Sequence, residues 1–79
     1  MEKDAIAQKV REIFVNKFQL DPRKITLETS LNNLGVDSLD LLEVIMDFED
    51  EFHVTFENEE LQSLSKVDDV INILVKKVN

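Results

Sequence analysis

The residues best suited to chemistry stand in one short run, Leu34-Gly35-Val36-Asp37-Ser38-Leu39, directly before a segment with helical periodicity. Gly35 permits a tight or left-handed backbone. Asp37 is a residue type that caps helix N-termini by accepting hydrogen bonds from free backbone N–H groups. Ser38 would then hold its hydroxyl at a loop-to-helix junction. Neither a histidine nor a Gly-x-Ser-x-Gly pattern surrounds it, so it lacks the setting of a hydrolase nucleophile and is better suited to carry an attached group.

The composition excludes several other kinds of chemical site. The chain has no cysteine, so neither a disulfide nor a thiolate metal site can form, and any thiol that it uses must come from outside. One histidine, His53, does not make a zinc site by itself. The acids do not follow the spacing of an EF-hand loop. We therefore expect no catalytic residue and no metal site.

Acidic side chains dominate the middle of the chain. The net charge is −8, and neither Lys nor Arg occurs between Lys24 and Lys66. This pattern argues against nucleic-acid binding, because phosphate contacts need clustered basic side chains. A surface of one sign favours steering toward basic protein surfaces. The alternative explanation is that the acids only keep a small protein in solution.

Hydrophobic periodicity predicts an all-α fold, a small four-helix bundle with a long first loop and a short third helix. The first helix covers about residues 3–18 and ends before Pro22, because proline disfavours helical geometry in the residue before it. The second helix covers about 38–52 and the short third helix about 57–63. A fourth helix occupies the C-terminal residues. Its predicted buried stripe consists of Val67, Val70, Ile71, Leu74 and Val78.

The segments between the predicted helices also contain residues that predict their structure. Residues 21–36 form the long first loop, which we expect to be anchored in the core by Ile25, Leu27, Leu31 and Leu34. Ser65 with Asp68 three residues later resembles a capping box at the start of the last helix. Phe56, Leu61 and Leu64 are expected to point inward from the region of the third helix.

Length and hydropathy predict one domain, covering residues 1–79. No apolar run approaches the roughly 20 residues of a membrane span, and the N-terminal residues lack a signal-peptide pattern. We expect a monomeric, cytoplasmic protein that does not contact membranes. The alternative is a cleaved organelle-targeting segment.

The second helix has three sets of residues when its positions are placed every 100° around the axis. The predicted core stripe consists of Leu41, Val44, Ile45, Phe48 and Phe52. The acids of the flank are Asp40, Glu43, Asp47, Asp50 and Glu51. Opposite the core stripe lie Leu39, Leu42 and Met46. Because burial of such a side chain contributes ~1.5–3 kcal/mol, their exposure would indicate a binding patch. We expect a neighbouring element to cover Leu39, but less so Leu42 and Met46.

The motif and the helix that follows it resemble acyl carrier proteins of the stand-alone, type II fatty-acid-synthesis kind. The resemblance covers nearly the whole chain and is strongest over residues 34–52. It implies that Ser38 accepts a covalent 4′-phosphopantetheine from a phosphopantetheinyl transferase, the holo-acyl-carrier-protein synthase. The arm then carries acyl chains as thioesters between fatty-acid synthesis enzymes, and the chain is a carrier rather than an enzyme.

The resemblance also implies that partner enzymes with basic docking patches contact the second helix. The predicted contacts are Asp37, Asp40, Leu42, Glu43, Met46, Glu49 and Asp50. One departure is that Phe56 and Glu57 stand where an Ile-Pro pair is common, and a bulky Phe56 could limit or redirect entry of an acyl chain. Two alternatives remain. One is a carrier of another cargo (polyketide, aminoacyl or D-alanyl), and the other is an acidic adaptor that carries nothing.

Overall fold

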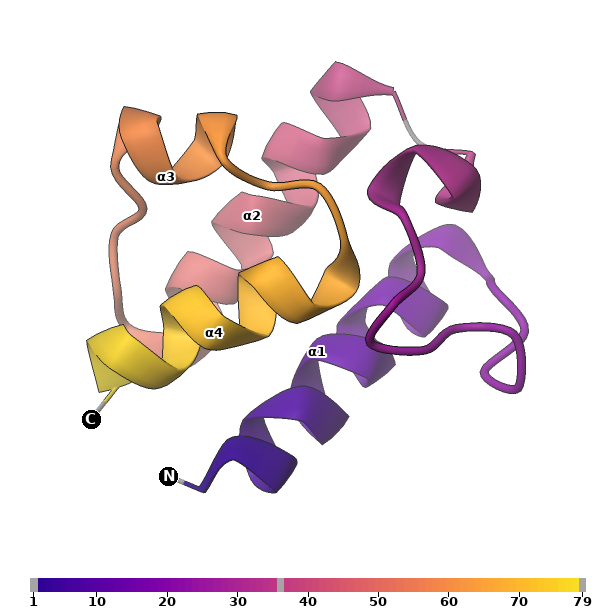
Figure 1. Cartoon of the computed structure of the whole chain (residues 1–79), viewed down its shortest axis with the longest axis horizontal. Helices are drawn as coiled ribbons and strands as arrows, with labels where there is room; N and C mark the ends of the chain where they lie inside the picture. The colour runs from indigo at the N-terminus through magenta and orange to yellow at the C-terminus, as the bar shows by residue number, and fades with distance from the viewer. Residues whose placement is uncertain (1, 36, 79) are drawn as a thin grey trace.

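Four α-helices surround a core of apolar side chains in the computed structural model, which describes residues 2–35 and 37–78 (Figure 1). The helices are α1 (Lys3–Phe18), α2 (Ser38–Phe52), α3 (Asn58–Gln62) and α4 (Val67–Val78), and a short 3-10 helix, η1 (Leu31–Leu34), lies in the first loop. Val36 of the motif and the two terminal residues lie outside the described residues. The predicted all-α bundle is confirmed, including the bounds of α1 and α2. No described helix has the length and apolar character that a membrane span requires.

One face each of α1, α2 and α4 forms most of the core. Nine side chains there are fully buried, namely Ile6, Val10, Phe14, Val44, Phe48, Val67, Val70, Ile71 and Leu74. Phe14 and Phe48 join α1 to α2 through an edge-to-face contact with ring centroids 5.4 Å apart. The predicted stripe of α4 is confirmed, with Val78 at its edge only partly buried. In α2 the prediction is correct except that Leu41 is only half-buried.

The long first loop is held by two side chains and by backbone bonds. Ile25 and Leu31 are buried and Leu34 is half-buried, as predicted. The prediction for Leu27 is wrong, because its side chain is 40% exposed. The carbonyl of Leu27 anchors the loop instead, accepting a hydrogen bond from the backbone N–H of Asp68 at 3.0 Å. The loop therefore crosses the start of α4 and is bonded to it along the backbone.

The start of α4 differs from the predicted capping box. The carboxylate of Asp69, not that of Asp68, accepts hydrogen bonds from the backbone N–H groups of Ser65 and Lys66, at 2.9 and 3.0 Å. The reason is that the helix begins at Val67, which places Asp69 at the third helical position, where a side chain reaches back to the residue before the helix. The Asp68 carboxylate accepts from Asn72 instead.

The third helix is shorter than predicted and buries no residue of its own. Its end is set by Ser63, whose backbone N–H and hydroxyl both donate to the carbonyl of Glu60. Its start is a capping box between Glu57 and Glu60, which the sequence analysis did not predict. Phe56, just before it, is buried as expected, while Leu61 and Leu64 are half-buried against the core.

Candidate attachment and docking site

Ser38 is the first residue of α2, and its side chain is exposed. The chain reaches it through Gly35, which ends η1 with a left-handed backbone, φ 75°. Asp37 caps α2, since its Oδ1 accepts a hydrogen bond from the backbone N–H of Asp40 at 2.9 Å. The predicted junction is therefore confirmed at its described residues, and the hydroxyl that it presents is accessible.

This position suits a phosphate ester better than a catalytic nucleophile. The first N–H groups of a helix have no partner within the helix, and the helix dipole adds positive potential at that end. A phosphate linked to Ser38 would lie in that potential. The one histidine of the chain, His53, follows the opposite end of α2. At 1.5 Å per residue it is separated from Ser38 by about 22 Å, too far to act as a base for the serine.

An apolar patch adjoins the serine along the exposed side of α2. Leu39, Leu42 and Met46 are 68%, 49% and 62% exposed. The expected exposure of Leu42 and Met46 is confirmed, whereas the expectation that a neighbouring element covers Leu39 is wrong. The reason is that the preceding loop turns its apolar side chains, Leu31 and Leu34, toward the core. Ser38 and three large apolar side chains thus occupy the same surface.

The predicted acidic contacts lie along this helix in different settings. Asp37, Glu43 and Asp50 are exposed, and Asp40 is half-buried. Glu49 is also half-buried, and its Oε2 accepts a hydrogen bond from the backbone N–H of Phe56 at 2.8 Å. Glu49 therefore also holds the connection between α2 and α3. Contact of these residues with partner enzymes stays a prediction.

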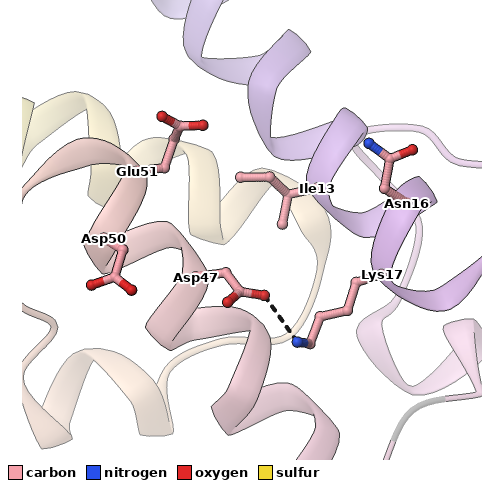
Figure 2. A pocket seen from close by; sticks show the side chains of 6 residues that line it. All are labelled: Ile13, Asn16, Lys17, Asp47, Asp50 and Glu51. Atoms are coloured by element: carbon pink, nitrogen blue, oxygen red, sulfur yellow. Dashed lines mark ion pairs between the residues drawn. The ribbon is translucent and has the colours of Figure 1, made fainter.

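A groove between α1 and α2 contains a cation that the sequence analysis missed (Figure 2). The Nζ atom of Lys17 lies 2.9 Å from Oδ2 of Asp47. The hydrogen bond to Asp47 raises the pKa of Lys17, and the charges of Asp47, Glu43 and Asp40 add to this effect. No signal within the second helix could reveal Lys17, because the two residues come together only when α1 packs on α2.

Metal ligation has no visible basis in the described part of the chain. No three side chains of the types His, Cys, Asp and Glu come together there in a way that could hold a metal ion. The acids of α2 are spread along the helix rather than gathered at one point. The features of the exposed side of α2 are therefore its acidic side chains and its apolar patch.

Comparison with known proteins connects this geometry to a family. Residues 8–74 match the family described as a phosphopantetheine attachment site. The chain is 41% identical over 80 residues to an acyl carrier protein of Petrotoga mobilis, an alignment that covers all of this chain and 94% of that protein. An acyl carrier protein of Thermotoga maritima is 38% identical over 77 residues, with 96% of this chain and 95% of that protein covered.

The three-dimensional comparison agrees. A crystal structure of an acyl carrier protein from Thermotoga maritima matches with a TM-score of 0.84 and 37% sequence identity, covering 99% of this chain and 92% of that chain. The resemblance inferred from the motif and the predicted bundle are both confirmed by these matches.

Proposed function

This chain belongs to the acyl carrier protein family, whose members carry 4′-phosphopantetheine on a serine, and we propose that here the serine is Ser38. On the attached arm the chain would carry growing acyl groups and present them to the enzymes of fatty-acid synthesis. The observation that supports this best is the exposed hydroxyl of Ser38 at the capped start of α2. We further propose that the chain acts as one carrier domain, monomeric and cytoplasmic.

The residues present fit the attachment reaction. The Ser38 oxygen attacks the β-phosphate of coenzyme A and forms a new O–P bond, while the bond to 3′,5′-adenosine bisphosphate breaks. The hydroxyl proton passes to a base of the transferase, which also supplies Mg²⁺. The arm, once attached, contributes a terminal thiol that forms thioesters with acyl groups. The chain itself contributes the accessible hydroxyl, the positive end of α2 and a docking surface.

The docking surface combines charge with apolar contact. Glu43 and Asp50 are exposed acids that can steer the chain toward basic patches of partner enzymes. Leu42 and Met46 lie exposed on the same helix and can lose water when a partner binds. The flexible side chain of Met46 suits a surface that meets several different enzymes.

The attachment is tested with Ser38→Ala. Incubation of the native chain with a phosphopantetheinyl transferase and coenzyme A should add about 340 Da, the mass of the arm, and Ser38→Ala should abolish this increment. Ser65→Ala serves as the matched control and should still be modified. The melting temperature of Ser38→Ala should stay close to the native value, because Asp37 rather than Ser38 caps the helix. An increment that persists in Ser38→Ala would contradict the assignment.

The group carried on the arm is identified on protein purified from its native cell. Mass spectrometry should find fatty-acyl thioesters on the arm. An aminoacyl, D-alanyl or polyketide group on that thiol would leave the attachment standing and contradict the fatty-acid part of the proposal. Unmodified serine throughout would favour an acidic adaptor.

The docking surface is tested with two substitutions that act on different rate constants. Glu43→Lys should slow association with the transferase and reduce the salt dependence of the on-rate, because it reverses a steering charge. Met46→Ala should mainly raise the off-rate, because it removes contact that forms after docking. Stopped-flow binding measures both. Unfolding by Met46→Ala would show that this side chain belongs to the core, against its 62% exposure.

A further inference from the structure

We propose that Lys17 is a specificity-determining residue for docking, a cation within the chain that withholds Asp47 from partner enzymes. This inference rests on the proposed function, because it concerns which acids of α2 a basic partner can use. The partner chemistry is a cationic patch of Lys or Arg side chains. Lys17 would direct that patch toward Glu43 and Asp50, which have no ion pair among the described residues, and away from Asp47.

The geometry shows how Asp47 is occupied. Figure 2 shows Lys17 reaching from α1 across the groove to Asp47 of α2. Ile13, Asn16 and the acid Asp50 also line this groove. The two charged atoms are 2.9 Å apart, and the side chain of Lys17 is 28% exposed compared with 46% for Asp47. The ammonium is therefore held in the groove while the carboxylate remains partly accessible. A cation from a partner that uses Asp47 must therefore share this carboxylate with Lys17 or displace Lys17 from it.

The other acids of α2 differ in their pairing. On the side facing α1, Glu51 is also paired, with Nζ of Lys9 at 3.6 Å. Among the described residues, none of the ion pairs within 4.0 Å involves Asp40, Glu43 or Asp50. Asp47 and Glu51 are therefore each paired with a lysine of α1, whereas of the three unpaired acids Glu43 and Asp50 are exposed and Asp40 is half-buried. The paired acids are also the two flank acids that the family resemblance did not assign to partner contact.

Lys17 also weakens the electric field of the nearby acids that have no ion pair. Its pKa is raised first by the hydrogen bond to Asp47 and further by the charges of Glu43 and Asp40. The ammonium is thus inside the field of these acids, and by reciprocity it weakens the field that they present to a partner. Because the pKa is raised from an already high value, Lys17 stays charged throughout the physiological pH range. Its effect on docking is therefore constant and does not act as a pH switch.

The first experiment measures association of the full chain with a phosphopantetheinyl transferase. Lys17→Met should raise the on-rate about two- to five-fold at low salt and steepen its salt dependence, since it removes the cation that neutralises Asp47. The matched control is Lys24→Met, which makes the same change in net charge at an exposed position of the first loop. Equal acceleration by both variants would show a simple effect of net charge and would overturn the proposal.

The second experiment isolates the pair through a double-mutant cycle. Asp47→Asn should slow association only slightly in the native background and should slow it more in the Lys17→Met background, where it reverses the gain. Equal slowing by Asp47→Asn in both backgrounds would overturn the proposal. Lys17→Arg keeps the cation and should behave like the native chain. Far-ultraviolet circular dichroism checks that each variant folds, and Lys17→Gln replaces Lys17→Met if the latter does not fold.

The third experiment does not depend on the proposed function. Hexa-arginine amide serves as a general cationic probe, and NMR follows the side-chain carboxylates during its titration. The probe should shift the Glu43 carboxylate in the native chain and shift Asp47 strongly only in Lys17→Met. An Asp47 response that is equal in both chains would overturn the inference about Lys17. Absence of labelling at Ser38 would instead contradict the proposed function alone.

Discussion

The third and fourth helices follow each other along the chain but are held by different forces. α4 buries four of its twelve residues, Val67, Val70, Ile71 and Leu74. α3 has five residues and buries none of them. Helices this short are unstable in water and depend on tertiary contacts. α3 is therefore held mainly by polar contacts near its ends, whereas α4 is held by core packing along its length.

The contacts at the start of α3 are centred on carboxylates. Oε1 of Glu60 accepts from the backbone N–H of Glu57 at 2.7 Å and from Nζ of Lys77, in the last turn of α4, at 2.9 Å. Oε2 of Glu49, in α2, accepts from the N–H of Phe56. These polar contacts are individually weak compared with core packing. Local opening should therefore begin at α3 and uncover Phe56 while α1, α2 and α4 remain packed.

The largest expected effect comes from the packed part of the molecule. Phe48→Ala should cost ~3–5 kcal/mol of unfolding free energy, because it empties a fully buried aromatic position. Leu61→Ala, in α3, should cost only about 1 kcal/mol, because its side chain is half-buried. Urea unfolding followed by circular dichroism measures both values. A cost for Leu61→Ala as large as that for Phe48→Ala would show that α3 belongs to the core.

A smaller effect is expected at the connection between α2 and α3. Glu49→Ala should cost about 1–3 kcal/mol, because the backbone N–H of Phe56 loses a charged acceptor. Its neighbour Asp50 is exposed, so Asp50→Ala is the matched control and should change stability by less than about 0.5 kcal/mol. Hydrogen exchange of the Phe56 amide should accelerate only in Glu49→Ala. Unchanged protection of this amide would indicate that the bond at 2.8 Å does not hold the connection.

The smallest effect is local and depends on pH. The N–H of Glu57 and then the ammonium of Lys77 lower the pKa of Glu60. With a folded pKa below the unfolded value of about 4.3, the contribution of Glu60 is fully present above that value and is lost as the pH falls through the folded pKa. NMR should show the Glu57 amide titrating below pH ~4.3. Lys77→Met should move this titration upward, and a titration that does not move would exclude the contact.

The main helices were predictable because the residues that determine them lie within each helix or next to its ends. The apolar spacing in α1, α2 and α4 determines which face is buried, and Asp37 and Gly35 mark where α2 begins. The position of Ser38 follows from the same signals. Periodicity also showed that Leu42 and Met46 turn away from the core.

The errors arose where a result depends on register or on packing between distant segments. A shift of one residue at the start of α4 transferred the capping role from Asp68 to Asp69. The exposure of Leu27 and Leu39 depends on how the first loop crosses the molecule. The pairing of Lys17 with Asp47 joins residues of different helices, and no periodicity within one helix encodes it.

The C-terminal ends of α1 and α2 each contain a backbone conformation that lowers the stability of the fold. Both helices terminate in a left-handed residue with a full side chain, Gln19 at φ 54° and His53 at φ 56°. That conformation costs an L-amino acid other than glycine about 1 kcal/mol or more, and glycine is the residue that adopts it freely. The chain has one glycine, Gly35, and it lies shortly before Ser38, the serine proposed for attachment. Gln19→Gly and His53→Gly should therefore each raise the melting temperature, and both positions lie outside the proposed docking surface.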